Sequence, residues 1–182
     1  DIPVSAHPSI RSVPACYASS ELAVRLAKIA GARLHILHVS TAKELQLFSD
    51  EPLASKNITA EACVAHLLFT LTHYNSLGTR IKCNPAVKRK TDREALRAAV
   101  NSGLIDVIAT DHAPHLLNEK EGGALKAMSG MPMIQFSLVS MLELVDEGVF
   151  SLETVVQKMC HAPARIYGIC QRGYIREGYQ AD

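Results

Sequence analysis

The chain has 182 residues, of which 48% are hydrophobic and 20% charged, and its formal net charge is +1 at pH 7. This composition is typical of a globular protein with one sizeable core, and it excludes a disordered chain. The longest run of Lys and Arg is the tripeptide at positions 88–90, which excludes the basic stripe of a nucleic-acid-binding protein. No apolar segment reaches the roughly 20 residues of a membrane span and no signal sequence opens the chain, so we expect no membrane partner and a cytoplasmic protein.

The five cysteines are odd in number and include no C-x-x-C pair. This pattern argues against both a disulfide framework and a cysteine-ligated zinc site. We therefore expect reduced thiols, most of them buried.

The first third of the chain predicts a connection, a helix and a strand. Residues 1–18 contain three prolines and little periodicity, which favours a connecting segment. Ser19 and Ser20 can cap a helix that ends at Gly31. Residues 33–39 (RLHILHV) are short and apolar between Gly31 and a serine, which predicts a buried strand.

The next segments continue the alternation of helix and strand. We expect a second helix over residues 41–48 (TAKELQLF), a strand over 58–64 (ITAEACV) and a short extended piece over 80–85. A third helix is indicated by Thr91 and Glu94, which have the spacing of a capping box, and it should end at Gly103.

The last third contains the clearest strand of the sequence, residues 104–110 (LIDVIAT). A polar, glycine-containing stretch follows, and residues 134–145 and 152–160 then have helical periodicity. Strands that alternate with helices at these lengths predict an α/β fold with a parallel sheet. In such folds the polar residues at the carboxyl ends of the strands carry the chemistry.

His38 and Asp111 each follow one of these strands. In an extended strand His38 would share a face with Leu34 and Ile36 while His35 points to the other side, so both histidines could not bind one ion. A strand-end imidazole can bind a metal or form hydrogen bonds in the core, and the residues alone leave both interpretations open.

Asp111 is in phase with the apolar strand before it, and His112 and His115 follow it closely. A carboxylate in this position can bind a cation or accept a proton from a metal-bound water. It can equally accept hydrogen bonds from backbone N–H groups of the next loop. No H-x-H or H-E-x-x-H pattern is present, so a complete metal site is not visible in the sequence.

Four motifs in register resemble the dihydroorotases of the amidohydrolase superfamily. They are HVSTAKEL (38–45), ITAEACVAHLLF (58–69), KCNPAVKRKTDREAL (82–96) and DVIATDHAPH (106–115). The stretch CHAPARIYG (160–168) and the end GYIREGYQAD are similar to the family's last helix and its return towards a small β-domain. The resemblance extends from about Ser19 to the last residue.

The resemblance implies a (β/α)₈ barrel with metal ions at the carboxyl ends of its strands. Residues 1–182 would be the carboxyl-terminal portion of that barrel domain, about strands six to eight with their helices and truncated at both ends, and residues 169–182 would start the return to the β-domain. His38 matches a metal ligand, and Asp111 matches a residue that binds metal and acts as general base and then acid. Asn84 and His115 match residues that hold the substrate's amide and carboxylate groups.

The implied reaction interconverts N-carbamoyl-L-aspartate and dihydroorotate, a step of pyrimidine biosynthesis. One or two zinc ions would lower the pKa of bound water and polarise the amide carbonyl. The small-molecule substrate is the expected partner, and a homodimer or a transcarbamoylase partner stays open.

Several family ligands, among them an H-x-H pair, should precede residue 1, so we expect the chain alone to be inactive. Two alternatives stay open. One is a non-catalytic homologue that serves as a scaffold for a partner, and the other is a related hydantoinase, dihydropyrimidinase or allantoinase.

Overall fold

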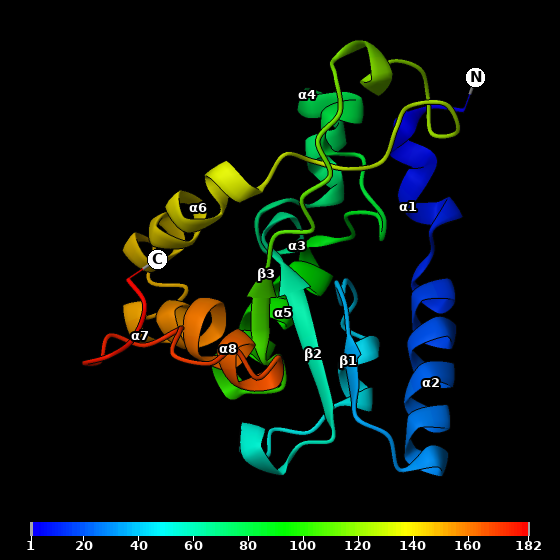
Figure 1. Ribbon diagram of the computed structural model, residues 1–182. Coiled ribbons are helices and arrows are strands. Elements are labelled where there is room, and N and C mark those ends of the chain that lie inside the picture. Colours follow the sequence, from blue (N-terminus) through cyan, green and yellow to red (C-terminus); the bar gives the residue numbers. More distant parts are fainter. Residues whose placement is uncertain (1, 182) are drawn as a thin grey trace.

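The computed structural model describes residues 2–181 and has a parallel sheet at its centre (Figure 1). The strands are β1 (Leu34–Ile36), β2 (Ile58–Cys63) and β3 (Val107–Ala109), in the order β1-β2-β3. Because both pairings are parallel, the carboxyl ends of all three strands lie at the same edge of the sheet. The α/β fold with a parallel sheet is confirmed, whereas the assignment of these strands to positions six to eight of a barrel stays a prediction.

The central strand β2 is almost entirely buried, as expected for a parallel strand with a neighbour on each side and cover on both faces. Its small apolar residues Ala60, Ala62 and Cys63 have no exposed surface. The same core continues into the segments after β2 and includes Leu67, Leu96 and Ile105. This core holds the ends of the strands in fixed positions.

The first long helix begins earlier than the sequence predicts. Helix α2 spans Val13–Ala30 and is preceded by the short α1 (His7–Ile10). The Ser12 hydroxyl accepts a hydrogen bond from the N–H of Ala15, and a proline lies in the first turn, so both start signals are present here and not at Ser19 and Ser20. The predicted end is confirmed, because Gly31 adopts the left-handed conformation (φ 63°).

The predicted helix over residues 41–48 is reduced to one 3₁₀ turn, Glu44–Leu47. The buried Glu44 carboxylate accepts hydrogen bonds from the Thr41 hydroxyl (2.8 Å), the Ser40 N–H (3.3 Å) and the Ser20 hydroxyl (2.7 Å). These local bonds compete with helix propagation, and they also attach the turn to α2.

Helix α5 (Lys90–Ser102) also begins before its predicted cap. The Asp92 carboxylate, and not a Thr91–Glu94 capping box, caps its start by accepting a hydrogen bond from the N–H of Arg89 at 3.3 Å, and it also accepts one from the N–H of Ala42 at 2.9 Å. The contact between Asp92 and Ala42 is not visible in any local sequence pattern, and it favours Asp92 as the residue that caps α5. The predicted end at Gly103 is confirmed (φ 90°).

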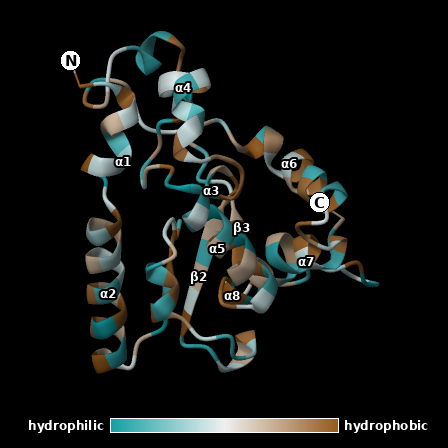
Figure 2. Cartoon of the chain, turned by 180° about the vertical axis from the view of Figure 1, so that it is seen from behind, coloured by the Kyte–Doolittle hydropathy of each residue, from teal (hydrophilic) through white to brown (hydrophobic). Residues whose placement is uncertain are grey.

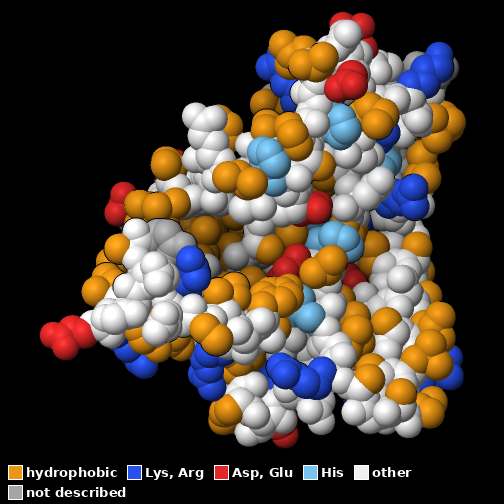
Figure 3. Space-filling view, viewed as in Figure 1, with side chains coloured by type: hydrophobic (Ala, Val, Ile, Leu, Met, Phe, Trp, Pro, Cys, Tyr) orange, Lys and Arg blue, Asp and Glu red, His pale blue; other side chains and the backbone are white. Residues whose placement is uncertain are grey.

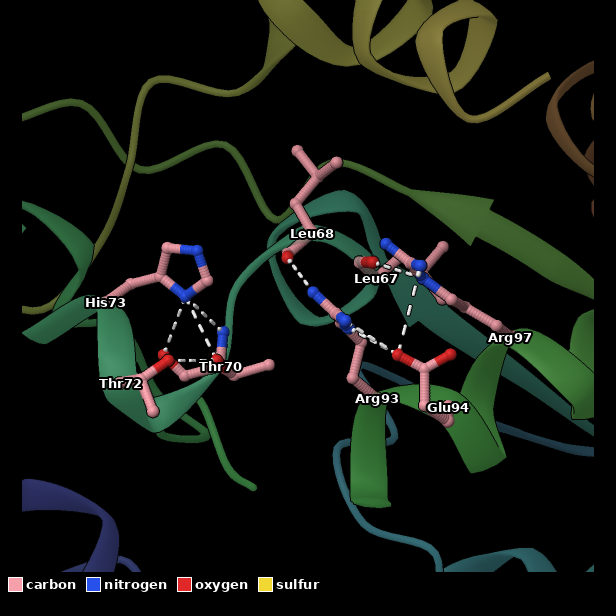
Figure 4. A network of polar contacts seen from close by, with 8 residues as sticks. All are labelled: Leu67, Leu68, Thr70, Thr72, His73, Arg93, Glu94 and Arg97. Carbon is pink, nitrogen blue, oxygen red and sulfur yellow. Dashed lines mark hydrogen bonds and ion pairs between the residues drawn. The ribbon is translucent and has the colours of Figure 1, made fainter. Parts of the chain in front are cut away.

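Arginines of α5 satisfy the last carbonyls of α3 (Val64–Leu68), as Figure 4 shows. Arg93 donates to the carbonyl of Leu68 at 3.0 Å, and Arg97 donates to that of Leu67 at 2.9 Å. Glu94 accepts a hydrogen bond from Arg93 and lies 3.9 Å from Arg97. These bonds hold the segment that follows β2 against α5.

Three short helical segments connect α3 to residue 82, where the sequence predicts an extended piece over 80–85. They are Leu71–His73, α4 (Tyr74–Leu77) and the 3₁₀ turn Gly78–Ile81. The Thr70 hydroxyl and backbone N–H both contact the His73 imidazole, which closes the first of these turns (Figure 4).

The carboxyl-terminal third contains α6 (Ile134–Asp146), α7 (Leu152–Val156) and α8 (Ala162–Ile166). One turn of π-helix, Gln157–His161, interrupts the helix predicted over 152–160. Residues 169–181 form turns, so the predicted return towards a β-domain stays a prediction. Several large hydrophobic residues of α2 and α6 are exposed. Figure 2 shows the hydrophobic positions along both helices in brown. Across residues 2–181, no helix combines the length and the hydropathy needed to span a bilayer.

Candidate active site

His38 and Asp111 lie just beyond the carboxyl ends of β1 and β3, and both have left-handed backbones. Their φ angles are 43° and 46°. Gln171 is the only other non-glycine residue with a positive φ in the part of the chain that the structure describes. Because this conformation costs a non-glycine residue roughly 1–2 kcal/mol, its occurrence at two equivalent strand ends is typical of side chains that the fold directs towards a site.

Glu61 of β2 holds the end of β1 in place. Its Oε1 accepts a hydrogen bond from the backbone N–H of His38 at 3.3 Å, and its carbonyl accepts one from Val39 at 2.8 Å. The side chain is only about one-tenth exposed. The sequence analysis missed this residue, although a carboxylate within an otherwise apolar buried strand is an unusual signal.

Two side chains of β2 contact the His35 ring. Its Nδ1 lies 2.8 Å from the Thr59 hydroxyl and its Nε2 lies 3.2 Å from the Glu61 carboxylate. Strand β1 ends at Ile36, and His38 has left the extended conformation, so the two-residue alternation no longer applies. Residues 35–38 all contribute to the wall of one cavity, and the expectation that the two imidazoles point to opposite faces stays a prediction.

This cavity, the strand-end cavity, has a volume of about 380 Å³ between the start of α2 and the end of β1. Its walls include His38, Asn84, Arg11 and Cys16. Two of the predicted site residues, His38 and Asn84, are therefore brought together although they lie far apart in the sequence. Figure 3, viewed as in Figure 1, shows histidine and acidic side chains next to one another in the middle of the visible face of the molecule.

Asn84 is exposed and is followed by a cis peptide bond to Pro85. It lines a second cavity as well, the basic cavity, which has a volume of about 480 Å³. The walls of the basic cavity also include Arg11, His7 and Lys82. The amide of Asn84 thus lies between two hollows, where it can donate and accept hydrogen bonds.

His115 lies on the long connection between β3 and α6 and lines neither cavity. Its Nε2 is 3.2 Å from the carbonyl of Ser129, and its Nδ1 is 3.7 Å from the Glu119 carboxylate. A side chain on Gly130 would approach the ring to 3.0 Å and Ala113 to 2.5 Å, so glycine allows the connection to fold tightly here. The structure does not place His115 beside His38 or Asn84.

Two buried thiols lie near Asp111. Burial raises the pKa of Cys63, and Glu61 and Asp111 raise it further. Burial also raises the pKa of Cys83, to about 12, with Asp111 acting in the same direction. Because a metal binds the thiolate, these cysteines are poor candidate ligands.

All five cysteines are free, but two of them, Cys160 and Cys170, are exposed, so the expectation of mostly buried thiols is only partly met.

The donors that remain suit a divalent metal in type but are few in number. An imidazole from His38 and a carboxylate from Asp111 are both ordinary zinc ligands. Among residues 2–181, however, no three His, Cys, Asp or Glu side chains group closely enough to hold an ion. His38 and Asp111 therefore do not complete a metal site within the described residues.

Comparison with known proteins is consistent with this geometry. Residues 11–182 match the Amidohydrolase family. The chain belongs to the amidohydrolase family. Its relatives in that family include the dihydroorotases of Endomicrobium trichonymphae, 38% identical over 87% of this chain and 38% of that protein, and of Latilactobacillus sakei, 36% identical over 96% and 41%. The chain thus spans about two fifths of the length of these curated relatives.

Solved structures of a hydantoinase and a dihydropyrimidinase superpose closely on this chain. The L-hydantoinase (dihydropyrimidinase) of Arthrobacter aurescens has a TM-score of 0.83 and 32% identity, over 90% of this chain and 37% of that one. The dihydropyrimidinase of Brevibacillus agri has a TM-score of 0.90 over the whole chain and 41% of its own, but at 24% identity it supports the fold alone.

Proposed function

We propose that this chain is part of a metal-dependent enzyme that hydrolyses a cyclic amide and, in the reverse direction, closes the ring. The observation that carries the proposal is the pair of left-handed residues His38 and Asp111, which follow β1 and β3, the two strands on either side of β2. An imidazole and a carboxylate are both common metal ligands. In a member of the amidohydrolase family, their position at the carboxyl ends of parallel strands is the one expected for metal-dependent hydrolysis. We assign the three strands to positions six to eight of a (β/α)₈ barrel.

The proposed roles follow the chemistry of each side chain. His38 and Asp111 would hold zinc, as one or two ions, and the bound ion would polarise the amide carbonyl and lower the pKa of water. The Asp111 carboxylate would accept the proton of the attacking water and pass it to the leaving ring nitrogen. Asn84 would hold the amide of the ring, and His115 its carboxylate.

We propose dihydroorotate and N-carbamoyl-L-aspartate as the substrate pair, which would place the protein in pyrimidine biosynthesis in the cytoplasm. The similarity to several dihydroorotases at 35–38% identity supports this choice. A hydantoinase is the second candidate, supported by the similarity to the L-hydantoinase structure at 32% identity.

Turnover of different rings by the complete gene product tests the proposal. We expect hydrolysis of dihydroorotate with a kcat/KM at least tenfold above those for hydantoin, dihydrouracil and allantoin. We expect a chelator to abolish the activity and zinc to restore it. A clear preference for one of the neutral rings would contradict the dihydroorotase assignment, and activity that survives exhaustive chelation would contradict the metal. Failure to hydrolyse all four rings would favour a scaffold.

A further inference from the structure

The basic cavity has an unusual balance of charge. Four of the side chains in its walls are basic, and none is acidic; they are His7, Arg11, Lys82 and Lys126. None of the ion pairs in the described part of the chain includes Arg11, Lys82 or Lys126. A concave site with one sign of charge attracts ions of the opposite sign.

The cations of this region lie close enough to affect one another. Burial lowers the pKa of His7 to about 4, and the charges of Lys82, Lys88 and Arg11 lower it further. Burial also lowers the pKa of Lys82, with Arg11 again acting in the same direction. The positive charges of Arg11 and Lys82 therefore repel one another, whereas His7 is neutral at pH 7, and no acidic side chain lines the basic cavity. A bound anion would relieve this repulsion.

Arg11 is the cation best placed to meet a ligand. It is exposed, and its guanidinium has no hydrogen-bond partner among the residues that the structure describes. By contrast, Lys82 is buried, and its ammonium donates to the carbonyl of Ala127. A free guanidinium offers paired N–H donors that match the two oxygens of a carboxylate.

Arg11 and Asn84 lie at the boundary of the two cavities, because both residues line the basic cavity and the strand-end cavity. A ligand held by Arg11 is consequently adjacent to the cavity that contains His38. The basic cavity thus lies next to the strand-end cavity, with Arg11 and Asn84 between them.

We propose that the basic cavity captures the carboxylate of an anionic ring substrate, with Arg11 as the binding group, before the ring reaches the strand-end cavity. This inference deepens the proposed function and rests on it for the identity of the substrate. It makes Arg11 a specificity-determining residue, since a neutral ring such as hydantoin or dihydrouracil has no carboxylate to bind.

Binding of two planar rings to the complete gene product tests this role without relying on turnover. Orotate carries a ring carboxylate, whereas uracil has the same ring without it, and calorimetric titration measures both affinities. We expect the wild type to bind orotate more tightly than uracil. Arg11→Gln should weaken orotate binding tenfold or more and leave uracil binding within twofold, because it removes a charge-assisted hydrogen bond. Arg11→Lys, which keeps the charge, should recover part of the loss.

Arg25→Gln is the matched control, because Arg25 is an exposed arginine of α2 whose ion-pair partner is Glu21. It should change neither affinity. Orotate binding that is undetectable in the wild type, unchanged in Arg11→Gln, or lost together with uracil binding would overturn the proposal. Orotate binding that depends on Arg11 in a protein that hydrolyses no ring would contradict only the proposed function. Dihydroorotate turnover with unchanged orotate binding in Arg11→Gln would contradict only the role of the basic cavity.

Discussion

The Glu61 carboxylate accepts a hydrogen bond from the backbone N–H of His38, 3.3 Å away on the neighbouring strand. The same carboxylate contacts the His35 ring at 3.2 Å. It therefore fixes the backbone of the proposed metal ligand through the peptide group rather than through the imidazole. Glu61 acts as a positioning residue for the strand-end cavity.

Replacing Glu61 tests this positioning role. We expect Glu61→Met, whose side chain cannot accept the His38 hydrogen bond, to fold and to reduce zinc affinity and kcat/KM by about 10- to 100-fold, the usual effect of removing a group that orients a metal ligand. Metal titration and steady-state kinetics measure the two effects. Thr59→Val is the control, because Thr59 contacts the His35 ring but not His38, and it should stay near wild type. Equal losses of zinc affinity and kcat/KM in both variants would show that Glu61 acts through the His35 ring and not through the backbone of His38.

Lys56 and Asp106 form a buried ion pair that connects β2 to the segment before β3. Their charged atoms lie 2.8 Å apart, and the side chains are 1% and 5% exposed. Asp106 also accepts a hydrogen bond from the N–H of Ala60 at 3.0 Å. The pair therefore helps to fix the position of β2 relative to β3 along the strand direction.

Breaking this pair should strongly destabilise the fold. We expect Lys56→Met to lower the free energy of unfolding by about 3–5 kcal/mol, because it leaves the Asp106 charge buried without its partner. The Lys56→Met/Asp106→Leu double variant should recover much of the loss. Urea unfolding provides the measurement, with Arg25→Gln at an exposed pair as a control that costs less than about 1 kcal/mol. A loss below 1 kcal/mol in Lys56→Met would contradict this account.

The sequence predicts those elements whose signals are local. Strand 58–64, the helix after residue 134 and the helix ends at Gly31 and Gly103 all follow from apolar periodicity or from the left-handed conformation that glycine permits. These features depend on neighbours within one or two turns of the chain.

Other features depend on contacts that the local sequence does not contain. Asp92 caps α5 while it also binds the backbone of Ala42, fifty residues earlier. Glu44 stops a helix by accepting hydrogen bonds from Thr41, which precedes its own turn, and from Ser20 of α2. Arg11 lies in a segment predicted as a simple connection, and its role emerges only where that segment meets Asn84.

His66 should make the fold sensitive to acid. Burial lowers its pKa from 6.5 to about 4, the nearby charges of Lys88 and His38 act in the same direction, and the carbonyl of Pro85 opposes them. The unfolded chain therefore binds a proton at a higher pH than the folded chain. The stability associated with the neutral ring is complete above pH 6.5 and is lost as the pH falls towards 4.

Urea unfolding at pH 7.0 and 4.5 measures this contribution. From the shift to about 4, we expect His66 to account for about 2–3 kcal/mol of the stability that the wild type loses between these two pH values. His66→Asn should show a correspondingly smaller loss, although it is less stable at pH 7.0. If the free energy of unfolding falls equally in both proteins between pH 7.0 and 4.5, His66 does not contribute to the acid sensitivity.

The most direct test of the central claim is the turnover of dihydroorotate by Asp111→Asn in the complete gene product. We expect kcat to fall at least about a hundredfold, because the amide cannot accept the proton of the attacking water, and zinc affinity to fall with it. The urea midpoint should change little, since Asp111 is exposed, and the control Asp146→Asn, at an exposed carboxylate of α6, should keep full activity. A kcat within threefold of the wild type would contradict the claim that His38 and Asp111 form the active centre.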